Sequence, residues 1–253
     1  MEKSKLKGHI AIFSANILFG LNNPISRSLM PETISPYVLI IFRLLGGMIL
    51  FWIASFFVKK EKVPPKDILL FFFAAIFGLT TNQLPFIVGL SMTSPIDASI
   101  VVTLLPILSM ILAAIIIKEP ITLMKTFGVL VGASGALVLI FGSHSGSVGS
   151  GNATGNLLAL FAVVSFALYL TLFKSLISRY SSITIMKWMF LFGSIQTYPF
   201  CHNSLMTTNF IAFDASVYWR IFYIVVIATF FTYILLPMSQ KVLRPTTLSM
   251  YNY

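Results

Sequence analysis

The segment PYVLIIFRLLGGMILFWIASFFV at residues 36–58 decides the fold class, because Arg43 is its one charged residue. A helix of about 20 residues crosses the roughly 30 Å hydrocarbon layer of a membrane, so this segment is long enough to span it. Segments of the same kind recur along the chain, at 8–30, 68–91, 96–117, 121–141, 155–176, 183–203 and 217–240. The sequence therefore predicts an all-α polytopic membrane protein, with the lipid bilayer as its main solvent.

The composition excludes a soluble protein. Hydrophobic residues make up 57% of the 253 residues and charged residues only 9%, which is too little charge to cover a water-facing surface. Lys3, Lys5 and Lys7, ahead of the first apolar segment, resemble the start of a signal peptide. No small-residue cleavage site follows them, and further spans do, so we interpret 8–30 as a retained first helix.

The distribution of positive charge predicts the orientation in the membrane. A formal net charge of +10 is also found in proteins that bind nucleic acid. Here, placing the N-terminus in the cytoplasm puts fourteen of the 17 Lys and Arg on the cytoplasmic side, and leaves out only Arg27, Arg43 and Arg220. Cytoplasmic loops of membrane proteins carry such an excess. We therefore expect a cytoplasmic N-terminus and no nucleic-acid partner.

A Gly/Ser-rich segment, SHSGSVGSGNAT at 143–154, divides the chain after its fifth predicted span. Because five spans precede it, the second part starts in the opposite orientation. The two parts share a weak internal similarity, which places Gly8 on Gly155 and continues over several helices. This pattern predicts two inverted repeats, residues 1–142 and 155–253, joined by an external linker.

The second repeat is shorter than the first. It holds three predicted spans and residues 245–253, which correspond to the start of a fourth span but are too few to cross a bilayer. We expect the chain to be a fragment, the product of a premature stop, or a trimmed form of a ten-helix protein.

Several short motifs occur in a fixed order along the chain. The first span carries Asn16-x-x-Phe19-Gly20-x-x-x-Pro24, and the second carries Phe42-Arg43. The others are Gly89-Leu90-Ser91-Met92-Thr93-Ser94-Pro95-x-x-Ala98, then Lys118-Glu119-Pro120-Ile121-Thr122 with Gly128, Gly132 and Gly135, and finally Leu243-Arg244-Pro245-Thr246-Thr247. In their order and spacing these motifs resemble the EamA-type transporters of the drug/metabolite transporter superfamily.

The resemblance implies ten helices in two inverted five-helix repeats, with both termini in the cytoplasm. It also implies transport of small metabolites, often amino acids, across the bacterial cytoplasmic (inner) membrane. This sequence departs from the family pattern in its incomplete second repeat. It departs also in Pro120, where the family more often has a basic or polar residue.

Arg43 is the one Lys or Arg well inside a predicted span, about 10 Å below its outer end. A cation at this depth needs a partner or water. In one interpretation, its planar donor group binds a substrate carboxylate. In the other, it forms an ion pair with Asp97, which begins the fourth span on the same side and is a candidate gating or coupling residue.

Polar side chains form a layer near the middle of the membrane. Helical spacing places five amides at the depth of Arg43, namely Asn22, Asn23, Asn82, Gln83 and Gln196. A buried amide needs a hydrogen-bond partner, so these side chains either join helices to one another or line a central cavity. Asn16 lies on the same helix face as Asn23, seven residues away, and is included in the predicted substrate pathway.

Two further residues have competing interpretations. Tyr169 either stacks on a substrate or packs in the protein interior. Glu119, at the inner end of the fourth span, caps the fifth helix, joins an ion pair of an inner gate, or takes part in proton coupling.

These observations predict a secondary transporter, an exporter of small polar metabolites in which the two repeats rock around a central cavity. The chain has no Gly-x-x-x-x-Gly-Lys-Ser/Thr sequence, so we expect an ion gradient to drive it, with protons as one candidate. One cysteine and three scattered histidines predict no metal site, and we expect no cofactor. The alternatives are a non-transporting scaffold or inactive fragment and, with no paired nucleophile and base in sight, an intramembrane enzyme.

Overall fold

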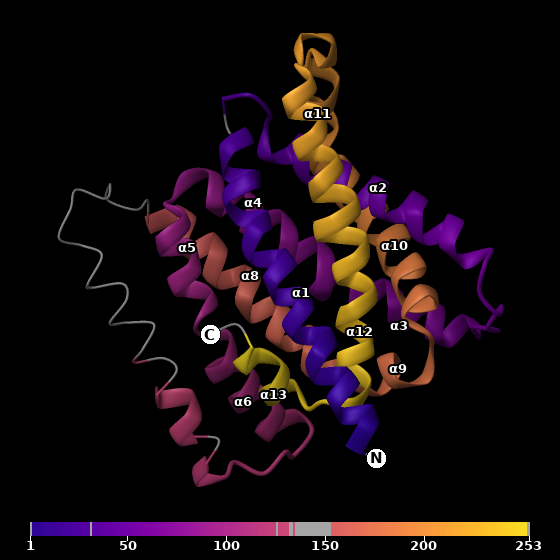
Figure 1. Ribbon diagram of the computed structural model, residues 1–253, viewed down its shortest axis with the longest axis vertical. Helices are drawn as coiled ribbons and strands as arrows, with labels where there is room; N and C mark the ends of the chain where they lie inside the picture. The colour runs from indigo at the N-terminus through magenta and orange to yellow at the C-terminus, as the bar shows by residue number, and fades with distance from the viewer. Residues whose placement is uncertain (1, 31, 125, 132–133, 135–152, 252–253) are drawn as a thin grey trace.

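A computed structural model describes residues 2–30, 32–124, 126–131, 134 and 153–251, and these residues form an all-α bundle without a strand (Figure 1). Five of its helical segments are long and apolar enough to cross a membrane: Pro36–Ser55, Pro65–Met92, Ile96–Ile116, Ala153–Leu172 and Ala215–Val242. The predicted fold class, an all-α polytopic membrane protein, is confirmed.

Residues 2–116, as far as the structure describes them, form six α-helices and one π-helical turn. Three of the helices begin with a proline, which has no N–H to leave unpaired in the first turn. The elements are α1 (Glu2–Leu29), α2 (Pro36–Ser55), α3 (Pro65–Ala75), η1 (Ile76–Thr80), α4 (Thr81–Met92), α5 (Pro95–Val102) and α6 (Leu105–Ile116).

The second half begins with α8. Its elements are α8 (Ala153–Leu172), α9 (Lys174–Arg179), α10 (Ser182–Thr207), η2 (Phe210–Ala212), α11 (Ala215–Phe222), η3 (Tyr223–Phe231), α12 (Thr232–Val242) and α13 (Pro245–Met250). Of the predicted span 121–141, residues 121–122 are not helical, residues 123–124, 126–131 and 134 are helical, and the rest lies outside the described residues.

The predicted span 96–117 is found as the membrane-capable segment Ile96–Ile116, with a break in its α-helix that the sequence analysis did not foresee. The α-helix stops after Val102 and resumes at Leu105. Pro106 has no N–H to donate to the carbonyl of residue 102, and its ring crowds that carbonyl. The side chain of Thr103 bonds the carbonyl of Ile100 at 2.6 Å at the break.

Two 28-residue segments, Pro65–Met92 and Ala215–Val242, each contain a π-helical stretch followed by a proline. The prolines are Pro85 in α4 and Pro237 in α12. In a membrane, the backbone groups released by such irregularities need partners within the protein. Threonine hydroxyls supply some of them in both segments.

Glycines allow some of the closest helix contacts. A side chain on Gly89 of α4 would come within 2.6 Å of the carbonyl oxygen of Gly155 in α8. A side chain on Gly47 of α2 would collide with the Phe190 ring of α10. Both pairs of helices are packed along their length. Small residues permit this approach in membranes, where helix packing has no hydrophobic driving force.

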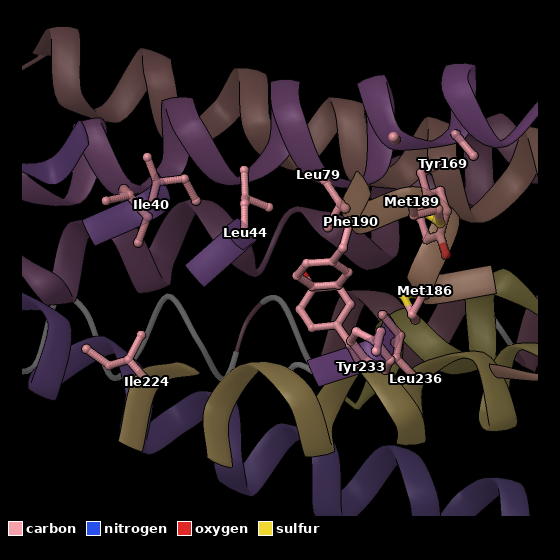
Figure 2. Packing of buried hydrophobic residues seen from close by; sticks show 14 of the residues in the cluster. Ile40, Leu44, Leu79, Tyr169, Met186, Met189, Phe190, Ile224, Tyr233 and Leu236 are labelled. Atoms are coloured by element: carbon pink, nitrogen blue, oxygen red, sulfur yellow. The ribbon is translucent and has the colours of Figure 1, made fainter. Parts of the chain in front are cut away.

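The main hydrophobic cluster joins α2, α10 and α12 and extends to α1, α3, α4 and α8. Figure 2 shows Leu44, Phe190 and Tyr233 among its members, one from each of the first three helices. The rings of Phe190 and Tyr233 meet edge to face, with centroids 5.1 Å apart. Such aromatic pairs favour this geometry. The cluster fixes the position of α12, which carries part of the site described below.

The N-terminus, α9 and α13 lie towards one end of the bundle, and α11 lies at the other (Figure 1). At the first of these ends, the first turn of α3 is tied to the last residue of α9 and to Tyr180, which follows it. Asp67, which is 4% exposed, accepts hydrogen bonds from Arg179 at 3.0 Å and from the Tyr180 hydroxyl. Burial, and then the contact with Asp67, raise the pKa of Tyr180 above its ordinary value.

Glu61 makes a second tie in the same place. Its carboxylate accepts the backbone N–H of Ser181 at 2.9 Å and the Ser181 hydroxyl at 2.9 Å. Burial raises the pKa of Glu61, but hydrogen bonds from Thr184 and Ser181 and the charge of Lys241 outweigh it. The pKa of Glu61 therefore lies below its ordinary value of 4.5.

Candidate functional site

A cavity of about 410 Å³ lies between the helices, with walls from α1, α2, α4, α5, α6, α8 and α12. Its polar wall consists of Asn16, Asn22, Asn23, Arg43, Asn82, Gln83, Ser99, Tyr233 and Tyr251. Its apolar wall consists of Phe19, Phe86, Ile87, Val102, Leu105, Val163 and Phe166, with Gly20 beside them. The structure thus brings six of the eight residues of the predicted substrate pathway to one cavity.

Among the described residues that line the cavity, Arg43 is the one with a formal charge. Its side chain is 3% exposed, and its Nε donates to the Thr229 hydroxyl at 3.2 Å. Thr229 in turn donates to the carbonyl of Ile224 at 2.7 Å, inside the π-helical η3. Thr229 therefore fixes the Nε edge of the guanidinium. The two terminal nitrogens of Arg43 make no hydrogen bond to the described residues.

Gln83 and Tyr233 form the second polar pair of the cavity. The Gln83 Nε2 donates to the Tyr233 hydroxyl at 2.6 Å, and Gln83 is 5% exposed. Its other amide atom, Oε1, is buried and has no partner among the described residues. Arg43 also lies close enough to Tyr233 to interact with it electrostatically. The three side chains therefore belong to one polar cluster.

The asparagines have mixed roles in the structure. Asn82 donates to the carbonyl of Ala162 in α8 at 2.9 Å, and Asn16 donates to the carbonyl of Tyr251 at 2.7 Å. Asn22 receives a long hydrogen bond of 3.4 Å from Ser26 in its own helix. Two of these amides thus join helices and line the cavity at once.

Tyr169 and Gln196 do not line this cavity. The Tyr169 hydroxyl donates to Gln240 at 3.2 Å, and its ring stacks on Phe166 with centroids 5.7 Å apart. Gln196 accepts from Thr80 at 2.7 Å and donates to the carbonyl of Phe72 at 3.1 Å. Both side chains therefore serve contacts between helices.

Asp97 and Glu119 also lie outside the cavity wall. Asp97 receives a long hydrogen bond of 3.4 Å from Thr93, and within the described residues it makes no ion pair with Arg43. Glu119, 8% exposed, accepts from Thr246 of α13 at 2.7 Å and interacts electrostatically with Lys174. Glu119 thus links the end of α6 to α13.

The sequence analysis did not identify Ser99, Tyr233 and Tyr251 of the polar wall, nor Thr229, which binds Arg43. Thr229 and Tyr233 make the contacts on which the site depends. They lie four residues apart, and so on one face of a helix, within the apolar span predicted at 217–240. Polar side chains repeated at this spacing were the available signal. In a membrane helix, however, the hydroxyl of a threonine often bonds the backbone of its own helix. The sequence therefore does not tell a threonine that binds another side chain from one that only bonds its own helix.

Comparison with known proteins places the chain among transporters. The model of the EamA-like transporter family matches residues 6–141 and 153–253. A protein of Archaeoglobus fulgidus named an uncharacterized transporter is 30% identical over 181 residues, which cover 72% of this chain and 62% of that relative. An uncharacterized transporter of Bacillus subtilis is 22% identical over 203 residues, 79% of this chain and 61% of the relative.

A plant relative and a solved structure extend the comparison. The protein WALLS ARE THIN 1 of Arabidopsis thaliana is 27% identical over 128 residues, which cover 49% of this chain and 33% of the relative. The matched part of the chain thus spans less than two thirds of each of these relatives. A crystal structure with 16% sequence identity superposes with a TM-score of 0.74 over 98% of this chain and 84% of the other, which shows a common fold.

Proposed function

Because the chain belongs to the EamA-like transporter family, we propose that it is a secondary transporter that exports small carboxylate-bearing metabolites, amino acids among them, through the Arg43 cavity. That it is a multi-pass membrane transporter rather than an enzyme follows from the family and from the names of its relatives. The observation that carries the substrate proposal is that Arg43 has no counter-charge among the described residues of the cavity wall.

A buried cation in a membrane protein is costly unless it is neutralised or hydrated. No aspartate or glutamate is among the described residues that line the cavity with Arg43. Thr229 binds the guanidinium at its Nε edge, so the two terminal nitrogens remain for a ligand. A carboxylate fits this pair of donors with two parallel hydrogen bonds. It also supplies the missing negative charge.

We further propose that the two parts of the chain, 1–142 and 155–253, are inverted repeats on either side of the linker at 143–154. Two equivalent helix contacts support this proposal. Gly8 of α1 packs against the C-terminal end of α12, and Gly155 of α8 packs against the C-terminal end of α4. Rocking of one repeat against the other would open the cavity to each side of the membrane in turn.

The orientation that we propose places the N-terminus in the cytoplasm, in the cytoplasmic membrane of a bacterial cell. The concentration of Lys and Arg on one side of the predicted spans supports it. An ion gradient, protons included, is the proposed source of energy. Asp97 and Glu119 are the carboxylates available for such coupling, at the two ends of the helix pair α5 and α6.

Transport by protein reconstituted into vesicles tests the proposed function. We expect saturable exchange of labelled carboxylates, and we expect Arg43→Ala to lower it by about two orders of magnitude, since a charge-assisted contact is lost. Arg220→Ala removes an exposed arginine of α11 outside the cavity and should leave exchange unchanged. Unchanged kinetics in Arg43→Ala would refute the substrate site, and no exchange of any metabolite by the unsubstituted protein would favour a scaffold.

A further inference from the structure

The polar wall of the cavity is centred on Tyr233. Its hydroxyl accepts a hydrogen bond from Gln83 at 2.6 Å, and the same hydroxyl lies within electrostatic range of Arg43. Its ring is held from two sides, by Phe190 at 5.1 Å and by Phe19 at 5.9 Å between centroids. Arg43 and Gln83 are therefore neighbours around one fixed side chain.

The side chain of Gln83 carries a buried hydrogen-bond acceptor that no donor of the described residues reaches. Its Nε2 is occupied by Tyr233, while its Oε1 has no hydrogen-bond partner among the described residues. The residue is 5% exposed and lines the cavity. An orphaned buried acceptor costs free energy, and most such groups in proteins find a partner. A donor on the ligand, next to the group bound by Arg43, would satisfy this oxygen.

The charge of the cavity selects the charge of the ligand. Arg43 contributes one positive charge, and the other described lining residues are neutral. A ligand of net charge −1 neutralises the site. A zwitterion brings its own ammonium group into the cavity and leaves the site with net charge +1, which is unfavourable in a low-dielectric interior.

The apolar wall selects the rest of the ligand. Phe19, Phe86 and Phe166 line the cavity together with the aliphatic residues. Aromatic side chains offer large faces to an apolar or aromatic group. A ligand that is polar at one end and apolar at the other matches the two walls of the cavity.

Resting on the proposed transport function, we infer that the preferred ligand is a monoanionic carboxylate with a neutral hydrogen-bond donor beside it and an apolar body, the class of apolar 2-hydroxy acids. Arg43 binds the carboxylate, Oε1 of Gln83 accepts from the hydroxyl, and Thr229 and Tyr233 are positioning residues. Within the carboxylates of the proposed function, this class is favoured over zwitterionic amino acids.

Three compounds with one carbon skeleton test this inference. Phenyllactate has the charge and the donor, phenylpropanoate lacks the donor, and phenylalanine carries an ammonium group in its place. Their binding to the purified full chain is measured by calorimetry at pH 7. We expect phenyllactate to bind about tenfold more tightly than either analogue, because each analogue leaves a buried polar group unsatisfied or a charge uncompensated.

Gln83→Met removes the acceptor at nearly constant volume and should bring the ratio between phenyllactate and phenylpropanoate close to one. Gln196→Met, the same change at an amide outside the cavity, should keep the tenfold ratio. Equal binding of the three compounds, or tighter binding of phenylalanine, would overturn the inference even if Gln83→Met does not fold. Binding with the expected ratio but without exchange across vesicles would instead overturn the transport function.

Discussion

The two 28-residue segments, Pro65–Met92 and Ala215–Val242, share their backbone design but differ in what they hold. In each, a threonine hydroxyl donates to the carbonyl five residues earlier at 2.7 Å, across the π-helical stretch. Thr81 then meets the hydroxyl of Ser165 in α8, whereas Thr229 accepts from the guanidinium of Arg43 in α2.

This difference distinguishes the features that build the fold from the side chains that would bind a ligand. The π-helical turn and the proline after it occur in both segments, so they belong to the fold. The charge occurs beside only one of them, so the chemistry of the site depends on the side chain that the threonine meets. Substitutions at corresponding positions of the two segments can therefore tell the two roles apart.

The largest expected effect concerns the glycine contacts of the two segments. Gly89→Ala would place Cβ 2.6 Å from the backbone carbonyl of Gly155, and backbone cannot rotate away. We expect a loss of about 3 kcal/mol in stability, at the upper end for overpacking. In the equivalent contact between α1 and α12, the new methyl group of Gly8→Ala meets only the side chains of Val242 and Leu243. We expect this variant to lose clearly less stability than Gly89→Ala. Thermal unfolding in detergent measures both, and equal losses would contradict this account.

The next effect concerns the threonines. Thr229→Val removes the acceptor for Arg43 Nε, and we expect the half-saturation concentration of a carboxylate substrate to rise about tenfold, with little change in maximal rate. Thr81→Val loses the contact with Ser165 instead and should leave substrate affinity unchanged. Thr229→Ser keeps the hydroxyl and should therefore keep the substrate affinity of the unsubstituted protein. Vesicle exchange kinetics decide the matter, and an equal effect of Thr81→Val would refute the distinction.

A smaller effect concerns the acidic residues near the start of each segment. Asp67→Asn weakens the bonds from Arg179 and Tyr180 and should cost about 1 kcal/mol. Asp214→Asn should be nearly neutral, because Asp214 only caps its own helix by accepting the N–H of Val217 at 2.9 Å. Asparagine is an equally good cap. Unfolding midpoints of the two variants compare the inter-helix tie with the local cap.

The smallest effect depends on pH. The pKa of Glu61, ahead of the first segment, is below its ordinary value of 4.5 in the folded protein. Its contribution to stability is therefore present above the unfolded pKa and is lost as the pH falls through the folded pKa. We expect Glu61→Gln to lower the unfolding midpoint slightly at pH 6, and the difference from the unsubstituted protein to shrink as the pH falls below 4.5. A difference between the two proteins that grows on acidification would mean that folding raises the pKa of Glu61, which would contradict this account.

The depth of a residue in the membrane could be predicted from the sequence, because helical rise converts residue number into distance. Arg43, Gln83 and Gln196 are polar residues in apolar spans, and counting residues from the end of each span gives their common depth. Counting does not tell in which direction each side chain points from its helix. A π-helical turn shifts the faces of the residues that follow it, and nothing in the residues around η1 or η3 announces that turn. Gln196 lies in α10, which has no π-helical turn, and the way this helix packs on η1 and α3 turns its amide to Thr80 and the carbonyl of Phe72 instead of the cavity.

The membrane fold itself was predictable from composition and span length, and it is confirmed. The interruption between α5 and α6 was not predicted, although Pro106 is present in the sequence. Proline is tolerated inside membrane helices when neighbouring groups satisfy the freed backbone, so its presence alone does not locate a break. Thr229 could not be paired with Arg43 from the sequence either, because 186 residues separate them.

Gly20 has a consequence for how such a protein changes over generations. It lines the cavity, and a Cβ atom there would meet nothing within 4 Å. A mutation to alanine at this position narrows the chamber without a helix contact from the added Cβ. The size of the cavity can therefore change over generations while the helix packing stays the same. At Gly89, by contrast, the same kind of mutation is removed by selection for folding.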